Sequence, residues 1–259
     1  MAESYVSSTS GGDQPVLSTF SNGLRVIEEL SGQRRGVREL AGAVGLNRQT
    51  TYRLLRTLVE AGWAERDPTT DTYALTSRLW ALAAQSFEIT DLRDMLSPAV
   101  NKLAETYGET VHLTIYEAGS VVYIDKADGS EPIRAYTVLG GRAPAYCVAT
   151  GKVLLAYQPE AERERVLETP IAAFSPNTIT DPGKLRAELD DIRERGYAVN
   201  RGEWRAQVGG IAIPVCSPLQ DVVAALGFSG PVQRIMDNFD KLLGALRNEL
   251  AERDLPRIS

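Results

Sequence analysis

The stretch from Arg48 to Arg56 carries side chains whose types and spacing suit binding to an anionic polymer. On a helix with about 100° per residue, five of them fall on one arc. No acidic residue lies in this stretch. Guanidinium, amide and hydroxyl groups hydrogen-bond to base edges and phosphates, so the arc has the composition of a DNA recognition surface. We name it the recognition arc: Arg48, Gln49, Tyr52, Arg53 and Arg56.

Two short helices joined by a tight turn, within residues 36–62, must hold this arc. The first helix ends at Gly45, a residue that tolerates the left-handed backbone of a helix end. Asn47 follows at the N-cap position of the second helix, where its side chain satisfies a free backbone N–H. This spacing is typical of a helix-turn-helix and favours DNA binding over an ordinary solvated helix face. The buried side of the second helix is predicted to be Thr51, Leu54, Leu55 and Leu58.

A small hairpin is predicted directly after the second helix. Residues 63–66 and 72–75 have the pattern of short strands, and the turn between them contains proline and aspartate. Such a hairpin is the wing of a winged helix-turn-helix, and its tip would bring Thr69 and Thr70 to the DNA backbone. Before these elements, a helix over residues 18–30 is expected to face the same core with Leu24, Ile27 and Leu30.

The composition is that of a globular protein with a basic segment. The 259 residues suffice for two domains, and 43% apolar and 24% charged residues are ordinary values. The net charge is −6, yet residues 34–67 hold seven arginines and four acidic residues, so this segment carries +3 and the remainder −9. No apolar run approaches the about 18 residues that span a bilayer, and no signal pattern is visible. We therefore expect a cytoplasmic protein with no membrane contact.

The second half offers no catalytic constellation. His112 is the only histidine, and in an alternating strand it is expected to have a local hydrogen-bond partner. Cys147 and Cys216 are too few for a disulfide framework and are expected to be buried thiols. No His/Cys cluster has metal-ligand spacing, and the loop at Gly140 and Gly141 lacks the phosphate-loop pattern. We expect no metal and no cofactor.

A concave anion site is the chemistry that this half does offer. A glycine-rich loop over residues 140–151 enters a short helix over residues 152–157. The N-terminus of such a helix directs free N–H groups at one point, which suits a small carboxylate. The candidate donors are Val148, Ala149, Thr150 and Gly151.

The remaining pattern mixes helices and strands in the order of an α+β domain. A nearly uncharged helix over residues 77–87 would expose large apolar side chains unless another surface covered them. We expect it to join the domains and to form part of a dimer contact, with intrachain packing as the alternative. Further helices are expected over residues 91–107, 181–196 and 234–252, and strands over 110–116, 121–125, 133–138, 198–201, 208–215 and 222–228.

The chain resembles the IclR family, the isocitrate-lyase-regulator type of bacterial transcription factor. The N-terminal stretches that carry the resemblance are LRVIEEL, VRELAGAVGLNRQTTYRLLRTLVEAGWAERD and TYALTSRLWALA, and the C-terminal ones are GGRAPAYCVATGKVLLA, GYAVNRGEW, GGIAIPV and AALGFSGP. The resemblance implies an α+β protein with an N-terminal winged helix-turn-helix and a C-terminal GAF-like domain whose central sheet is flanked by helices. It divides the chain into a disordered tail (1–15), a DNA-binding domain (16–76), a linker helix (77–90) and an effector-binding domain (91–255).

The resemblance and the pattern together imply two sites. The residues expected to contact DNA are Arg38, Asn47, Arg48, Gln49, Thr50, Tyr52, Arg53, Arg56, Thr69 and Thr70. Four of these, Arg48, Gln49, Thr50 and Arg53, are expected in the major groove, and Tyr52, Arg56 and the wing threonines on phosphate or sugar. The residues expected to bind the effector are Cys147, Val148, Ala149, Thr150, Asn200, Gly210, Gly227 and Ser229.

The chain departs from the family pattern at three of these positions. Asn200 stands where an acid is common, Gly210 where a cysteine can occur, and Gly227 where a serine is frequent. The pocket is therefore expected to be roomier and less charged than one made for a two- or three-carbon keto acid. Our hypothesis is a larger effector that is aromatic or hydroxylated.

These features predict a transcriptional regulator and not an enzyme. We expect a homodimer or homotetramer that binds a palindromic operator in double-stranded DNA. A small-molecule effector, a carboxylate or aromatic metabolite, would bias the operator affinity from the C-terminal domain. Two alternatives stay open: an enzyme that acts on a small carbonyl compound through Cys147 or Cys216, and a binding module that dimerises without any effector.

Overall fold

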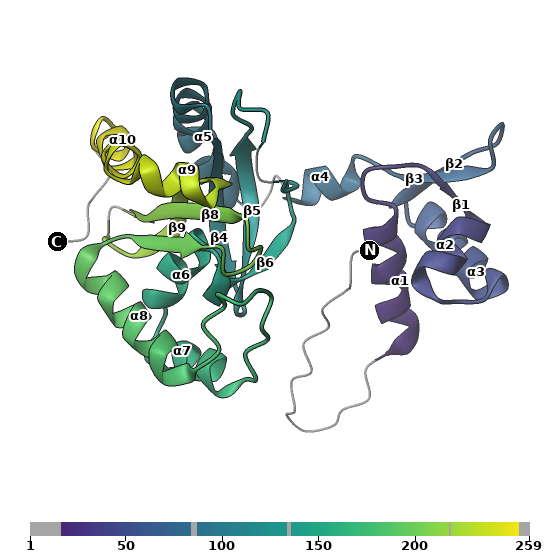
Figure 1. The fold of residues 1–259 in the computed structure, drawn as a ribbon. Coiled ribbons are helices and arrows are strands. Elements are labelled where there is room, and N and C mark those ends of the chain that lie inside the picture. Colours follow the sequence, from purple (N-terminus) through teal and green to yellow (C-terminus); the bar gives the residue numbers. More distant parts are fainter. Residues whose placement is uncertain (1–16, 84–86, 134–135, 218, 254–259) are drawn as a thin grey trace. The chain divides into compact units, whose positions relative to one another are not determined.

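The computed structural model describes residues 17–83, 87–133, 136–217 and 219–253 (Figure 1). The chain divides into two compact units, one up to Phe87 and one from Glu88 onward. No helix in the described ranges is both long enough and apolar enough to cross a lipid bilayer. We describe each unit by itself.

Three helices build the helix-turn-helix of the N-terminal unit: α1 (Ser18–Glu29), α2 (Val37–Val44) and α3 (Arg48–Glu60). α2 ends at Gly45, whose φ of 69° is left-handed, as the turn requires. Asn47 caps α3, because its side chain accepts the backbone N–H of Thr50 at 2.8 Å. The predicted helix-turn-helix is confirmed. Its core contains Val26, Leu30, Leu40, Val44, Leu54, Leu55, Ala64 and Tyr73.

The prediction for α1 was wrong at Leu24. This side chain is 46% exposed, whereas Val26 is fully buried. Ile27 is half-buried and Leu30 is buried, as expected. The apolar residues of α1 form two stripes, and Phe20 lies with Leu24 on the exposed one. Helical spacing alone does not select which of two apolar stripes packs on the neighbouring helices.

A three-stranded antiparallel sheet completes this unit. β2 (Ala64–Asp67) and β3 (Thr72–Leu75) form the predicted hairpin. β1 (Arg35–Gly36), for which no strand was predicted, pairs with β3 and makes the order β1-β3-β2. Arg35 lies opposite Tyr73 and Gly36 opposite Thr72. The backbone immediately before α2 is therefore hydrogen-bonded to the wing.

Two helices follow the wing. α4 (Arg78–Ala83) is shorter than the helix expected over residues 77–87, and α5 (Phe87–Tyr107) begins before residue 91. Leu79 is half-buried, while the side chains of Trp80 and Leu82 lie outside the described residues. The expected dimer contact of this segment stays a prediction.

A six-stranded antiparallel sheet organises the C-terminal unit, with the order β6-β5-β4-β9-β8-β7 (Figure 1). β4 (Thr110–Glu117) and β5 (Ser120–Ala127), two strands that were predicted, form a hairpin. A second hairpin consists of β8 (Val208–Cys216) and β9 (Val222–Pro231), and β9 pairs with β4. The edges are β6 (Arg142–Pro144) and β7 (Ala198–Arg201).

Helices cover both faces of this sheet (Figure 1). On one face, α6 (Ala149–Ala156), α7 (Glu160–Glu168) and α8 (Pro182–Arg195) contribute to one hydrophobic cluster. On the other, α5 packs with α9 (Val232–Asp237) and α10 (Phe239–Ala251). Val111 and Leu113 of β4 belong to the α5 cluster, so His112 between them faces the α6 side. The α+β architecture with a helix-flanked sheet is confirmed.

Some boundaries of the C-terminal unit differ from the prediction. Residues 133 and 136–138 are not in a strand, and the edge strand is β6 instead. α6 begins at Ala149 rather than at residue 152. The single helix expected over residues 234–252 is two helices, α9 and α10, which meet at Asn238. The strand expected over residues 133–138 was therefore wrong where the structure describes it, whereas the helices were predicted and only their boundaries differ.

Candidate functional site

The recognition arc lies on the exposed side of α3. All five of its residues are exposed, and Tyr52 in its middle has 46% of its surface accessible. Thr50, in the first turn, is half-buried. The opposite side of the helix packs into the core through Thr51, Leu54 and Leu55. α3 therefore presents one polar surface and buries the other, as the spacing predicted.

Three arginines on α2 and α3 are available for a ligand. Among the described residues, the guanidinium groups of Arg48, Arg53 and Arg38 have no hydrogen-bond acceptor and no ion-pair partner, and all three are exposed. Arg56 differs, because its Nε donates to Glu60 Oε1 at 2.7 Å. An exposed ion pair contributes little to stability, so Arg56 can exchange this carboxylate for a phosphate.

Asp67 shapes the tip of the wing. Its Oδ1 accepts the backbone N–H of Thr69 at 2.8 Å and that of Thr70 at 3.4 Å. The hydrogen bond from Thr69 is the main reason why the pKa of Asp67 lies below its ordinary value. The hydroxyl of Thr70 lies 2.7 Å from that of Thr72. The exposed hydroxyl of Thr69 has no partner in the part of the chain that the structure describes, and it is the group free to bind a phosphate.

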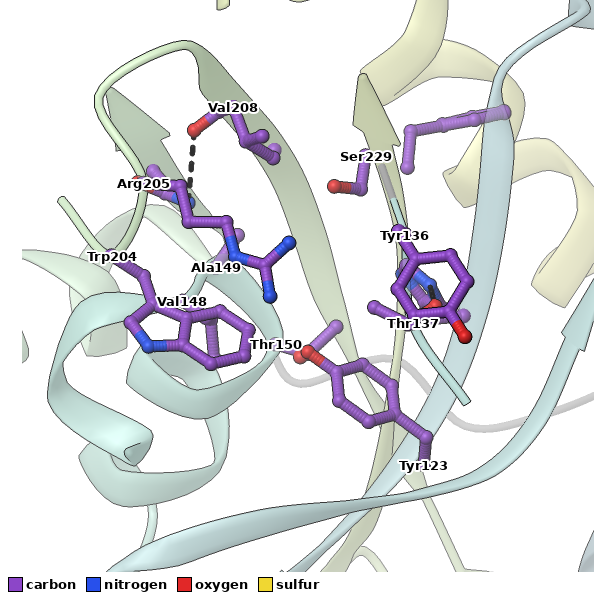
Figure 2. A pocket seen from close by; sticks show the side chains of 14 residues that line it. Tyr123, Tyr136, Thr137, Val148, Ala149, Thr150, Trp204, Arg205, Val208 and Ser229 are labelled. Carbon is purple, nitrogen blue, oxygen red and sulfur yellow. Dashed lines mark hydrogen bonds between the residues drawn. The ribbon is translucent and has the colours of Figure 1, made fainter. Parts of the chain in front are cut away.

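In the C-terminal unit a pocket opens on the α6 side of the sheet (Figure 2). It lies between the N-terminus of α6, strands β4, β8 and β9, and the loop after β7. The space between its lining residues is about 480 Å³ and includes open solvent. We call it the sheet pocket, and its lining residues are His112, Tyr123, Tyr136, Thr137, Val148, Ala149, Thr150, Asn200, Trp204, Arg205, Val208, Gly210, Phe228 and Ser229.

Arg205 supplies the positive charge of the sheet pocket. Figure 2 shows its guanidinium pointing into the middle of the space, toward Tyr123 and Tyr136. The guanidinium carbon lies 4.9 Å from the centre of the Trp204 ring, which supports it by a cation–π contact. Arg205 has no carboxylate partner among the described residues. Arg205 is the lining residue that is always charged, so this wall of the pocket suits an anionic group of a ligand.

The N-terminus of α6 forms the wall beside Arg205. Val148 is the N-cap residue, and no side chain caps the helix. The first N–H groups of a helix have no intrahelical acceptor, so the helix start directs donors into the pocket at Ala149 and Thr150. Gly151 has a packing role, since a Cβ there would lie 2.4 Å from the carbonyl oxygen of Ala145. An anion beside Arg205 would meet these donors as well.

His112 stands at the sheet end of the pocket. Its Nε2 lies 2.7 Å from the hydroxyl of Thr137, so the histidine has a hydrogen-bond partner, as expected, although that partner is 25 residues away in the sequence. The ring also packs against Tyr123, with 4.8 Å between ring centres. Burial, with a smaller contribution from the Lys126 charge, lowers the pKa of His112 to about 3. The imidazole is therefore neutral near pH 7 and offers a hydrogen bond without a charge.

The structure places the predicted effector residues in two groups. Six of them line the sheet pocket: Val148, Ala149, Thr150, Asn200, Gly210 and Ser229. Cys147 and Gly227 do not line it. Cys147 is buried, its Sγ lies 3.5 Å from the carbonyl oxygen of Pro144, and burial raises the pKa of its thiol. At Gly227 a Cβ would lie 2.6 Å from the carbonyl oxygen of Ile211, so this glycine allows close approach of the sheet backbone.

Several lining residues were missed by the sequence reasoning. One signal was present for His112, because it alternates with the apolar residues of β4. The loop after β7 has no periodic pattern, so the sequence did not mark Trp204 and Arg205 as pocket residues. The missed residues are Tyr123, Tyr136, Thr137, Trp204, Arg205, Val208 and Phe228, together with His112 as a pocket residue.

Comparison with protein-family models finds two matches that together span most of the chain. Residues 19–68 match the model described as the IclR helix-turn-helix domain. Residues 84–253 match the model described as the bacterial transcriptional regulator IclR C-terminal domain.

Curated relatives are named as transcriptional regulators. The HTH-type transcriptional regulator KdgR of Escherichia coli is 32% identical over 214 residues, which cover 82% of this chain and 81% of the relative. The glycerol operon regulatory protein of Streptomyces coelicolor is 32% identical over 229 residues, covering 87% and 88%.

Solved structures of similar proteins agree with this fold. An IclR homologue from Microbacterium hydrocarbonoxydans, complexed with 4-hydroxybenzoate, has a TM-score of 0.80 and 26% identity, with 91% of this chain and 97% of that chain covered. The IclR of Thermotoga maritima has a TM-score of 0.72 and 26% identity, with 92% and 98% covered.

Proposed function

Because the chain belongs to the IclR family of bacterial transcriptional regulators, we propose that it binds a palindromic operator as a symmetric oligomer and that an aromatic carboxylate in the sheet pocket modulates this binding. The family assignment makes the chain a DNA-binding regulator with an effector-binding C-terminal domain. The proposal adds which residues act, which class of effector binds, and how the operator is arranged.

The observation that supports DNA recognition most is the unpaired charge on α3. Arg48 and Arg53 are exposed and have no acceptor in the described part of the chain, at a helix face backed by a buried core. We assign Arg48, Gln49, Thr50 and Arg53 to base edges in the major groove. Tyr52, Arg56, Arg38 and the wing threonines take phosphate and sugar contacts, and Asn47 stays the helix cap. With DNA as its partner, the proposed place of action is the cytoplasm.

The operator is proposed to be a palindrome read by a homodimer, alone or as half of a tetramer. Two recognition helices related by a two-fold axis require half-sites about 34–36 Å apart, one turn of DNA. We propose residues 16–76 as the DNA-binding domain, 77–90 as the linker that also contributes to the dimer contact, and 91–255 as the effector-binding domain. The nearly uncharged sequence of residues 77–87 supports this role.

The sheet pocket is proposed to hold a small aromatic carboxylate. Arg205 and the N–H groups of α6 would bind the carboxylate, while the rings of Tyr123, Trp204 and Phe228 would pack against the aromatic part. A hydroxyl at the far end of the ligand would reach the His112–Thr137 pair. The complex of the Microbacterium relative with 4-hydroxybenzoate supports this class of ligand.

We propose that the chain has no enzyme activity. The alternative requires a cysteine nucleophile, and a nucleophilic cysteine must be a thiolate. Cys147 and Cys216 are both buried, and burial raises the pKa of both thiols. Neither cysteine is among the lining residues of the sheet pocket. The naming of the relatives as regulators supports the same reading.

A mobility-shift titration at fixed salt tests this function. The full chain is titrated onto its own upstream promoter DNA with and without 4-hydroxybenzoate, and a shuffled duplex serves as the control. We expect specific binding whose Kd changes with 4-hydroxybenzoate but not with cyclohexanol, which lacks both the carboxylate and the aromatic ring. Equal affinity for the shuffled duplex would reject operator recognition. An unchanged Kd across a panel of hydroxylated aromatic acids would reject the effector class.

A further inference from the structure

A lysine is buried inside the C-terminal unit, where two carboxylates neutralise it. The side chain of Lys152, on α6, is 1% exposed. Its Nζ donates to Glu203 Oε1 at 2.8 Å and to Glu188 Oε1 at 3.2 Å. We call these three residues the Lys152 cluster. A buried ammonium group destabilises the fold unless it is paired, so the cluster must hold together in the folded chain.

The two carboxylates of the Lys152 cluster lie in different surroundings. Glu188, on α8, is partly exposed and also accepts from Arg195 Nη2 at 2.8 Å. Glu203 is only 5% exposed and lies in the loop of residues 202–207, between β7 and β8. The next two residues of this loop, Trp204 and Arg205, line the sheet pocket (Figure 2). Glu203 therefore ties the loop to α6 directly before the residues that face the pocket.

The backbone of Glu203 is held from two further directions. Its N–H donates to the side chain of Asn200 at 2.7 Å, and its carbonyl oxygen accepts from the Thr178 hydroxyl at 2.6 Å. Gly202 precedes it with a φ of 80°, and a Cβ at that position would lie 2.4 Å from the carbonyl oxygen of Ala206. The loop is thus a tight turn with a fixed anchor, because L-residues with side chains rarely adopt this backbone.

We propose that Glu203 is a positioning residue for effector binding. Through its ion pair with Lys152, it holds the loop so that Arg205 and Trp204 face the ligand. Lys152 belongs to the helix whose N-terminal N–H groups form the neighbouring wall. The pair therefore fixes the distance between the Arg205 guanidinium and these N–H groups, and one carboxylate must reach both. This inference rests on the proposed role of the sheet pocket.

Two matched variants separate positioning from simple stabilisation. Glu203→Gln keeps the shape of the side chain and removes its charge, and Glu188→Gln does the same to the other partner of Lys152. We expect both to lower Tm. Only Glu203→Gln should raise the Kd for 4-hydroxybenzoate, by about tenfold for a weakened charged hydrogen bond, while Glu188→Gln stays within about twofold of the wild type.

A third variant tests the anchor of the loop without a change of charge, and a second readout does not depend on ligand binding. Thr178→Val removes the shorter of the two hydroxyl hydrogen bonds to the carbonyl oxygen of Glu203 without changing any charge, and the one from Ser175 at 3.2 Å remains. We expect this variant to weaken binding as well. In a background with Trp63→Phe and Trp80→Phe, Trp204 is the only tryptophan of the chain. Acrylamide quenching of its fluorescence in the ligand-free full chain reports directly on the loop.

The outcomes are distinct. Stronger quenching of Trp204 in Glu203→Gln but not in Glu188→Gln supports the positioning role, even where the wild type binds no carboxylate and the proposed function has failed. Equal quenching in the wild type and both variants, with only Tm lowered, overturns it. A Kd that rises equally in both variants also overturns it, because the loss then follows the stability of the domain.

Discussion

The Nε2 atom of His112 and the hydroxyl of Thr137 lie 2.7 Å apart across the floor of the sheet pocket, although the two residues belong to different segments of the C-terminal unit. The ring is buried, and its pKa is lowered to about 3. The folded chain therefore keeps this imidazole neutral at pH values where the unfolded chain protonates it. The unfolded state binds the extra proton, so acid destabilises the fold.

We expect this histidine to make stability depend on pH between its ordinary pKa of 6.5 and about 3. From about pH 7.5 to about pH 5, the free energy of unfolding should fall by about 2 kcal/mol more in the wild type than in a His112→Gln variant. Urea unfolding across this range measures the difference. Most carboxylates stay ionised above pH 5, so they add little to it. Parallel curves for the two proteins would contradict the assignment.

Removal of the Arg53 side chain should weaken operator binding. Arg53→Ala is expected to raise the free energy of operator binding by about 1–3 kcal/mol if Arg53 reads a base. Arg56→Ala should cost less, since Arg56 already has a partner in Glu60. Arg193→Ala, on α8 of the other unit, is the control. Mobility shifts at constant ionic strength measure all three, and wild-type affinity in Arg53→Ala would reject its assignment.

Arg205 should select for a charged ligand. Arg205→Met is expected to raise the Kd for 4-hydroxybenzoate by at least about tenfold and to leave that for 4-hydroxybenzamide nearly unchanged, because only the first ligand carries a charge. Arg201→Met, an exposed arginine at the end of β7 outside the pocket, is the control. Isothermal titration calorimetry measures both ligands. Equal losses of affinity for 4-hydroxybenzoate and 4-hydroxybenzamide in Arg205→Met would mean that Arg205 acts by packing on Trp204.

Two glycines of the sheet should respond differently to an added methyl group. At Gly227 a Cβ would lie 2.6 Å from a backbone oxygen, so Gly227→Ala should destabilise the fold by about 1–3 kcal/mol. At Gly210 the Cβ would lie 3.0 Å from the Phe228 carbonyl oxygen and 3.5 Å from the Ala149 Cβ, at the pocket wall. Gly210→Ala should therefore weaken effector binding more than it lowers Tm. Thermal unfolding and calorimetry on both variants compare the two effects.

The cysteines should be inert in the folded chain. Both are buried with a raised thiol pKa, so a thiol reagent such as Ellman's reagent should modify them only after addition of denaturant. Cys147→Ser and Cys216→Ser identify which thiol reacts. Fast modification of the native protein at neutral pH would reopen the enzymatic alternative.

The helix-turn-helix could be predicted because its signals are local. Gly45 and Asn47 end one helix and begin the next through their own backbone and side-chain preferences. β1 could not be predicted, because Arg35 and Gly36 become a strand only through pairing with residues 72–73 of β3. The prediction that Leu24 faces the core was wrong for a related reason, since the neighbouring helices decide which of two apolar stripes is buried.

The sheet pocket could be predicted on one side only. Val148, Ala149 and Thr150 lie where a glycine-rich segment enters a helix, and that pattern is visible in the sequence. Trp204 and Arg205 face them only because β7 and β8 pair and the loop between them is tied to α6. The family resemblance identified the pocket residues on the strands, Asn200, Gly210 and Ser229. The charge of the pocket comes from Arg205, which no sequence pattern marked.

The pairing of β1 with β3 joins the wing to the chain at both of its ends. One end continues from α3 into β2, and the other is hydrogen-bonded to the two residues that precede α2. We therefore expect the hairpin and α3 to bind DNA as one rigid unit, with a fixed offset between the contact in the groove and the neighbouring contact on the backbone. We expect an effector to change the distance or the angle between two such units in the oligomer. The DNA contacts that each unit makes should stay the same.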